Sequence, residues 1–246
     1  MVLYDCSAVW RDGALPLCAE WAIAPGHLAP RPVSTSEVKK RALFGLGNPG
    51  PQYRLTRHNV GYRSIEALAE KLGTPPFRPE RYALTTAISW HGIAWHLFLP
   101  TTYMNRSGDA VAYWKNRLDL SPEELLIVTD EIQLPLGALR LSEKGSAGGH
   151  NGLAHVIQAL GTEAFPRLRI GIGKNFPRGG QVEYVLSPFS EEEEKTFQAL
   201  LPHIVACLIA WGIEGTARAA SQYNRRTPLV PNPSSDTSKL SPPTAE

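Results

Sequence analysis

Two kinds of hydrophobic pattern alternate along the chain between residues 41 and 226. Short apolar runs predict strands at residues 42–46, 83–90, 93–99, 125–128, 139–141 and 168–172. Apolar side chains at i, i+3, i+4 and i+7 predict helices over residues 57–72, after residues 105 and 152, and from residue 190. Strands that alternate with helices are typical of an α/β fold, in which helices cover both faces of a twisted, largely parallel sheet. A hairpin signal at His91-Gly92 indicates that the sheet is mixed.

The two ends of the chain differ in composition from this body. Prolines interrupt residues 1–40, so we expect an irregular N-terminal extension there. Residues 41–226 are expected to form a single α/β domain. Residues 227–246 are rich in Pro, Ser and Thr, and we expect them to be a disordered tail.

The overall composition is that of a soluble globular protein. The 246 residues are 43% hydrophobic and 20% charged, and the net charge of +2 neither demands nor excludes nucleic acid. We expect no membrane span, because no run approaches the roughly 20 apolar residues that a span needs. Acidic residues interrupt the N-terminal segment, so no signal peptide is expected. Cys6, Cys18 and Cys207 lack CxxC spacing, which indicates a reduced, cytoplasmic protein.

A Gly- and Pro-rich loop, Gly45–Pro51, joins the first predicted strand to the first predicted helix. Its G-x-G-x-x-G pattern matches the dinucleotide-binding fingerprint, which needs a helix to open at the third glycine. Pro49 and Pro51 remove two N–H donors, and the helix is expected to begin only near Thr56, so a nucleotide site is disfavoured. A simple tight turn is the second alternative. A polar cluster in and after the loop favours a functional site instead: Asn48, Tyr53, Arg57, His58 and Asn59.

Three further loops carry polar side chains at strand ends or helix starts, namely Asn105, Asp130 and the pair His150-Asn151. A histidine paired with a carboxylate can act as a general base. The sequence has no G-x-S-x-G nucleophile elbow, so the expected nucleophile is water, which asparagine side chains can hold. Structural alternatives remain for each group: a surface or capping role for His58, a turn for Asp130 and a helix cap for Asn151.

No cofactor is expected from the sequence. Four histidines show neither HExxH spacing nor neighbouring cysteines, which argues against a metal site: His91, His96, His150 and His155. The stretch Gly145–Gly152 lacks the Lys-Ser/Thr of a P-loop, so ATP is not expected either.

Six short motifs follow one another along the body of the chain. They are GLGNPG at 45–50, TRHN at 56–59, PTTYMN at 100–105, DE at 130–131, GGHNG at 148–152 and RLRIGIG at 167–173. Together they resemble the bacterial-type peptidyl-tRNA hydrolase family over about residues 41–226. The resemblance implies an α/β domain around a twisted mixed sheet. It also implies a cytoplasmic monomer that cleaves the ester between a peptide and the 3′-terminal ribose of tRNA, without a metal.

The resemblance also implies roles for individual residues. His58 matches the general base, Asp130 the carboxylate that supports it, and Asn48 the residue that distinguishes a blocked peptidyl amine from a free aminoacyl one. Five residues match substrate contacts or line the same site: Tyr53, Tyr103, Met104, Asn105 and Asn151. The sequence departs from the family pattern at Thr129, where a histidine is usual, and at Gln133, where an acidic residue is usual. A lysine expected near Ser142 is also missing.

The expected partner is the acceptor end of peptidyl-tRNA, and basic side chains in the body and near its end are candidates for phosphate contacts. They are Arg140, Lys144, Arg167, Arg169, Lys174, Arg178, Arg218, Arg225 and Arg226. Two other classes remain as alternatives: a non-catalytic RNA-binding protein on the same fold, and a nucleotide-dependent oxidoreductase. The presence of both His58 and Asp130 favours the enzyme over the RNA-binding protein, and the prolines of the first loop disfavour the oxidoreductase.

Overall fold

The structure, a computed structural model, describes residues 38–225. The expected N-terminal extension and C-terminal tail fall almost entirely on residues 1–37 and 226–246, outside the described part of the chain.

Within residues 38–225, seven strands form one mixed sheet in the order β2-β3-β4-β1-β5-β7-β6. Their bounds are β1 Lys39–Gly45, β2 Arg78–Glu80, β3 Ala83–Trp90, β4 Ile93–Pro100, β5 Leu125–Glu131, β6 Leu139–Ser142 and β7 Arg167–Gly171. The central pairings, β1 with β4 and β5, and β5 with β7, are parallel. The outer pairings, including the predicted hairpin of β3 and β4, are antiparallel. The prediction of a mixed sheet is therefore confirmed, with the parallel part confined to the centre.

Six α-helices and four short 3-10 turns complete the described chain. The helices are α1 Val60–Leu72, α2 Ser107–Leu118, α3 Asn151–Leu160, α4 Gln181–Leu186, α5 Glu191–Glu214 and α6 Thr216–Tyr223. The 3-10 turns are η1 Pro51–Tyr53, η2 Arg57–Asn59, η3 Met104–Arg106 and η4 Pro122–Glu124. The sequence pattern predicted neither β2 nor α4.

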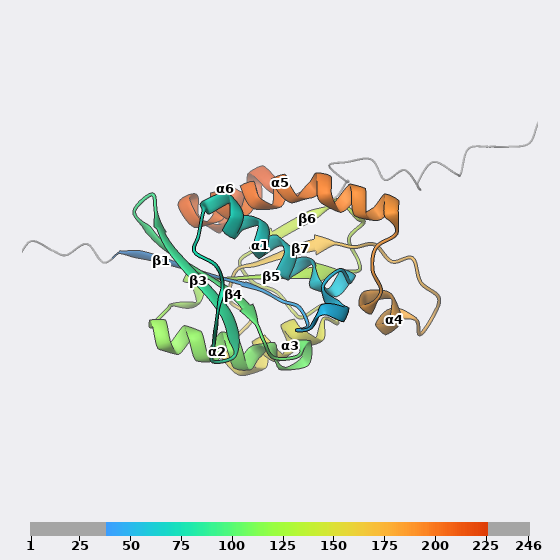
Figure 1. Ribbon diagram of the computed structural model, residues 1–246, viewed down its shortest axis with the longest axis horizontal. Helices are drawn as coiled ribbons and strands as arrows, with labels where there is room; N and C mark the ends of the chain where they lie inside the picture. The colour runs from blue at the N-terminus through green and yellow to red at the C-terminus, as the bar shows by residue number, and fades with distance from the viewer. Residues whose placement is uncertain (1–37, 226–246) are drawn as a thin grey trace, which may run out of the picture. The chain divides into compact units, whose positions relative to one another are not determined.

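Helices cover both faces of the sheet, with α1, α5 and α6 on one side and α2 and α3 on the other (Figure 1). Strand β5 has a buried side chain at every position. Leu126 and Val128 join the core beneath α1 and α5, whereas Leu125 and Ile127 join the core on the opposite face. Because both faces are covered, a continuous apolar run is what this strand requires.

Helix α5 corrects one expectation from the sequence. By length and composition it could cross a membrane, with a mean hydropathy of 1.6 over its most apolar window. The expectation that no apolar run approaches the length of a span is therefore wrong. In the fold, 56% of that window is buried, and Phe197, Leu200 and Ile204 are fully buried in the core. The apolar length of α5 thus serves packing within this domain.

The first glycine loop lets α1 approach the end of β1 very closely. A Cβ atom on Gly45 would lie 2.4 Å from the carbonyl oxygen of Gly61, and a Cβ atom on Gly61 would lie 2.5 Å from that of Val128. Helix α1 itself begins only at Val60, so its N–H groups do not open at Gly50 as a dinucleotide site requires. These glycines are needed for backbone packing beside the carboxyl ends of β1 and β5, where ligands bind in open α/β sheets.

Candidate active site

A cavity of about 590 Å³ lies at the carboxyl edge of the parallel strands. Loops after β1 and β4, the end of β5 and the start of α3 all contribute to its wall. Seven of the eight residues to which the resemblance assigns a role line it: Asn48, His58, Tyr103, Met104, Asn105, Asp130 and Asn151. Tyr53, in η1, is not among the lining residues, so its expected substrate contact stays a prediction.

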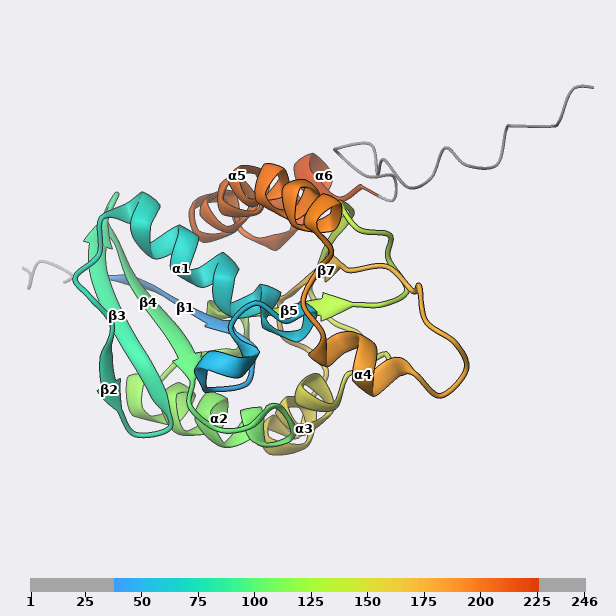
Figure 2. The same ribbon diagram turned by 45° about the vertical axis from the view of Figure 1, so that its right-hand side comes forward.

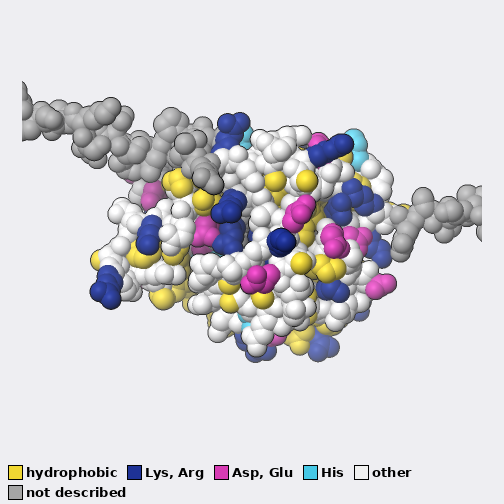
Figure 3. All heavy atoms as spheres, turned by 180° about the vertical axis from the view of Figure 1, so that it is seen from behind, with side chains coloured by type: hydrophobic (Ala, Val, Ile, Leu, Met, Phe, Trp, Pro, Cys, Tyr) yellow, Lys and Arg dark blue, Asp and Glu magenta, His cyan; other side chains and the backbone are white. Residues whose placement is uncertain are grey.

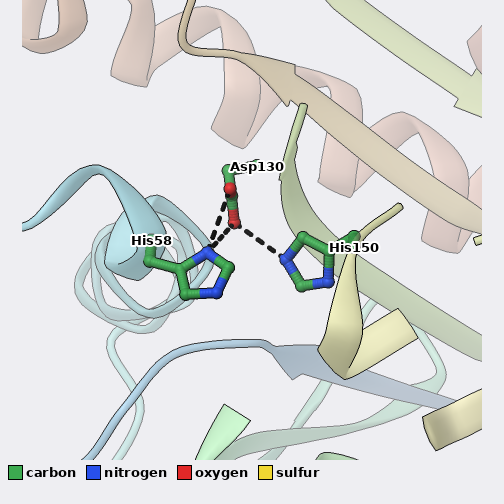
Figure 4. Close-up of side chains that lie close together, drawn as sticks. All are labelled: His58, Asp130 and His150. Carbon is green, nitrogen blue, oxygen red and sulfur yellow. Dashed lines mark hydrogen bonds and ion pairs between the residues drawn. The ribbon is translucent and has the colours of Figure 1, made fainter. Parts of the chain in front are cut away.

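The side chains of His58 and Asp130, which both line this cavity, point toward each other (Figure 4). Nδ1 of His58 lies 2.9 Å from one carboxylate oxygen of Asp130 and 3.0 Å from the other. Asp130 is 2% exposed at the end of β5, and His58 is partly buried in η2. An ionised carboxylate only accepts hydrogen bonds, so Nδ1 carries the proton. In the neutral ring Nε2 then has a free lone pair and can act as a base.

A second histidine, His150, reaches the same carboxylate. Its Nε2 lies 2.9 Å from Oδ1 of Asp130 and 2.7 Å from Oγ1 of Thr129. His150 is also the N-cap of α3, because its Nδ1 accepts the N–H of Leu153 at 3.1 Å. The cap that sequence reasoning considered for Asn151 therefore belongs to His150. The sequence signal for the N-cap role of His150 was its position directly before an apolar helical pattern.

Burial and charge act in opposite directions on the two partners. Burial alone would raise the pKa of Asp130, but His58, His150 and their hydrogen bonds hold that pKa well below its usual range. Burial opposes protonation of His58, yet the charge and hydrogen bond of Asp130 prevail and raise the pKa of the ring above its ordinary value. The carboxylate is therefore ionised and stabilises the imidazolium that forms when His58 takes a proton.

Asn48 is held through both its side chain and its backbone. Its Oδ1 accepts the N–H of Met104 at 2.8 Å. The side chain of Asn59 accepts the N–H of Asn48 at 2.8 Å and donates to its carbonyl at 3.0 Å. Since Oδ1 is held by a backbone donor, the group that Asn48 can offer to a ligand is the N–H donor of Nδ2. Asn59, for which the sequence suggested no specific role, thus positions Asn48.

The outer rim of the cavity is partly apolar. Tyr103 is 59% exposed on one side, and Val182 of α4 is 66% exposed on the other. Val185 and Leu186 continue the wall formed by α4, which lies beside η2 (Figure 2). Sequence reasoning missed this wall, although its apolar residues at i, i+3 and i+4 were the available signal.

Three side chains of the site belong to types that can hold a metal ion. The candidate ligand atoms of His58, Asp130 and His150 lie within 4.8 Å of one another. Nδ1 of His58 and Nε2 of His150 both face the carboxylate, and the remaining nitrogen of His150 serves Leu153. A cation between these groups would replace both hydrogen bonds to Asp130, so we assign none of the three as a metal ligand. A metal-free site stays a prediction.

Two arginines expected to contact phosphate have internal roles instead. Arg167 is fully buried, and its guanidinium donates to the carbonyls of Phe165 and Glu163, at 3.0 and 2.7 Å, and to that of Gly145. The expectation that Arg167 contacts tRNA is therefore wrong. Arg169 pairs with Glu131 and donates to the carbonyl of Ser146 at 2.5 Å. The exposed candidates among residues 38–225 are Arg140, Lys144, Lys174, Arg178, Arg218 and Arg225.

The described residues that line the cavity include no serine, threonine, cysteine or lysine, so the lining offers no nucleophile of these types. The free nitrogen of His58 can take a proton from water, and Asp130 stabilises the charge that results. A histidine that can act as a base, paired with a buried carboxylate, is an arrangement that hydrolases use.

Comparison with known proteins identifies the family. The family model described as peptidyl-tRNA hydrolase matches residues 42–230. The peptidyl-tRNA hydrolase of Phocaeicola vulgatus is 43% identical over 187 residues, which cover 76% of this chain and 100% of the relative. That of Salinibacter ruber is 50% identical over 150 residues, 61% of this chain and 79% of the relative. The crystal structure of peptidyl-tRNA hydrolase from Acinetobacter baumannii has a TM-score of 0.72 at 32% identity, covering 78% of this chain and 97% of that one. The chain belongs to the peptidyl-tRNA hydrolase family, which confirms the resemblance and the fold expected from it.

Proposed function

We propose that His58 activates water in the reaction of this family, the hydrolysis of the ester between a peptide and the 3′-terminal ribose of tRNA. The observation that carries this proposal is the contact of Nδ1 of His58 with Asp130, which leaves Nε2 free at the cavity. Family membership supplies the substrate class. The acceptor end of tRNA is the proposed nucleic-acid partner, and we place the enzyme in the cytoplasm as a monomer.

The proposed reaction begins with transfer of a proton from water to Nε2 of His58. The water oxygen bonds to the ester carbonyl carbon, and the carbonyl electrons move to oxygen. The ester bond to ribose then breaks, and the proton passes from His58 to the departing ribose oxygen. The products are the free peptide acid and tRNA with a free hydroxyl. Asp130 stays ionised throughout and stabilises the imidazolium.

Asn48 has the chemistry to recognise the peptide bond of the substrate. Nδ2 of Asn48 is a donor, because its Oδ1 is occupied by Met104. A peptidyl or N-blocked substrate carries an amide oxygen that accepts such a donor. A free aminoacyl-tRNA carries an ammonium group instead, which offers no acceptor. Asn48 therefore favours blocked substrates in this proposal.

The Asn48→Asp variant tests this role. The carboxylate keeps an acceptor for Met104 but loses the donor, so we expect kcat/KM for N-acetyl-aminoacyl-tRNA to fall by about tenfold, the equivalent of one hydrogen bond. Hydrolysis of free aminoacyl-tRNA should not fall by the same factor. The ratio of activity on the blocked substrate to activity on the free one should therefore decrease. Asn116→Asp, which adds the same charge on the exposed surface of α2 outside the lining of the cavity, is the control. An unchanged ratio of the two activities in Asn48→Asp would rule out the assignment.

The acid limb of the pH profile tests the base. Only neutral His58 accepts a proton, so activity is lost as pH falls through its pKa in the folded protein. Because that pKa is raised, we expect the midpoint in kcat/KM to lie above pH 6.5, the ordinary value. In Asp130→Ala the carboxylate that raises the pKa of His58 is absent, while the burial that lowers this pKa remains. The midpoint of the acid limb should therefore move to lower pH. A wild-type midpoint below 6.5, or one that Asp130→Ala leaves in place, contradicts the proposed pair.

Binding of tRNA would rest on exposed basic side chains. On the face seen in Figure 3, Lys and Arg side chains are spread among acidic ones and do not gather into one patch. This distribution suits several separate phosphate contacts, each of which weakens as salt rises.

Release of an N-acetyl-aminoacyl group from tRNA by the purified protein tests the function as a whole. The non-catalytic RNA-binding alternative predicts bound tRNA without release. Release of the N-acetyl-aminoacyl group by the wild-type protein, which contains both His58 and Asp130, supports the enzyme.

A further inference from the structure

His150 is a buried side chain to which the proposed reaction gives no step. Its imidazole cannot turn freely, because Nδ1 accepts the N–H of Leu153 in the first turn of α3. Gly152 allows the ring to lie close to that turn, since a Cβ atom there would lie 3.0 Å from Cε1 of His150. The position of the ring is therefore set by the helix.

The cap also fixes the tautomer of His150. Because the lone pair of Nδ1 is used by Leu153, the proton of the neutral ring is on Nε2. Two acceptors face this N–H, Oδ1 of Asp130 at 2.9 Å and Oγ1 of fully buried Thr129 at 2.7 Å. The hydroxyl of Thr129 in turn points to the carbonyl of Asp130 at 3.4 Å.

The two histidines thus contact one carboxylate from different directions. Their ring centroids lie 4.8 Å apart and their planes are tilted by 47°. His58 bonds to both oxygens of Asp130, whereas His150 bonds to Oδ1 alone. A carboxylate attached to a strand by one carbon can still rotate about its χ2 torsion. The N–H of His150 opposes that rotation.

We infer that His150 is the positioning residue for Asp130, holding the carboxylate so that both oxygens face Nδ1 of His58. This inference rests on the proposed function, because it assigns the work of His150 to the catalytic pair. The other titratable groups that line the cavity are Glu131, paired with Arg169, and Tyr103 on the exposed rim.

Two substitutions separate the cap from the contact with Asp130. In His150→Asn, the short amide can still accept the N–H of Leu153 as an N-cap, but its atoms do not extend to the place of Nε2. In His150→Gln, the longer amide can place an N–H donor near Oδ1 of Asp130, and the cap is lost. His150→Asn therefore removes the contact with Asp130, and His150→Gln removes the cap on α3.

We expect His150→Asn to keep a melting temperature near that of the wild type and to lose about tenfold in kcat, with KM unchanged. His150→Gln should melt about 2–4 °C lower, the effect of a lost cap in a chain of this size, and should retain more of kcat than His150→Asn. If His150 had only a structural role, kcat would follow the melting temperature, and His150→Asn would retain more of kcat than His150→Gln. That order, or wild-type kcat in His150→Asn, would overturn the inference.

Titration of the His58 imidazole by NMR gives a readout that does not need turnover. Without the donor of His150, the carboxylate can turn about χ2 and no longer presents both oxygens to Nδ1, so the pKa of His58 should fall in His150→Asn and stay near that of the wild type in His150→Gln. The acid limb of kcat/KM should shift in the same direction. An unmoved His58 titration in His150→Asn argues against the positioning role. Failure of the wild-type enzyme to release peptide, with the titration shift intact, would instead overturn the proposed function and leave the contact standing.

Discussion

The His58→Ala variant is expected to lose about 10²- to 10⁴-fold in kcat, the range typical of a missing general base. The alanine leaves Asp130 and the cavity in place but removes the nitrogen that accepts the proton of water. Binding of tRNA should survive, because the exposed basic side chains that can contact phosphate lie on other segments of the chain. Single-turnover release of an N-acetyl-aminoacyl group, measured beside tRNA binding, separates the two effects.

His203→Ala is a suitable control for this variant. His203 is exposed on α5, away from the lining of the cavity, so its loss should leave turnover unchanged. Near wild-type turnover in His58→Ala would mean that another group activates the water.

The Asp130→Asn variant should also lose about 10²- to 10⁴-fold in kcat, although it changes one oxygen to nitrogen. The new amide can donate to Nδ1 of His58, which would then carry its proton on Nε2 and lose its basic lone pair at the cavity. A comparable exchange in the serine protease triad costs about 10⁴-fold because the tautomer is wrong. Asp130→Ala should lose less than His58→Ala, since the base remains and only its orientation and tautomer are no longer fixed.

The double variant His58→Ala/Asp130→Ala completes this comparison. Residues that act as a unit show strongly non-additive losses, so the double variant should cost little more than His58→Ala alone. Fully additive losses in kcat would show that Asp130 works independently of His58.

Elements with a strong local pattern were predictable from the sequence. The apolar run Leu125–Val128 predicted a strand covered on both faces, and β5 is such a strand. The three-residue strand β2 contains Pro79 and has no strand pattern, and the apolar i, i+3, i+4 pattern of α4 spans less than two turns, which is too short to predict a helix by itself. Tertiary contacts hold such short elements. The guanidinium of Arg57 donates to the carbonyls of Tyr184 and Pro188 at the end of α4.

The candidate site was predictable only in part. His58 and Asp130 are 72 positions apart in the sequence. They could be predicted to form a pair because both match family motifs and because Asp130 lies at the end of a predicted strand. His150 was considered only as a loop residue or metal ligand, because its two hydrogen bonds depend on how α3 meets β5. Arg167 was a candidate for phosphate only because it is basic, and arginine side chains are rarely buried completely. Three carbonyl acceptors make its complete burial possible.

The contact between β1 and α1 has a consequence for protein engineering. Replacing a glycine inside a helix by alanine is a common route to higher stability, and Gly61 lies in the first turn of α1. Here a methyl group would lie 2.5 Å from the carbonyl oxygens of both Leu46 and Val128. The helix would have to move away from β5, and η2 with His58 would move with it. A stability design guided by helix propensity alone would therefore disturb the catalytic pair from a position that makes no contact with substrate.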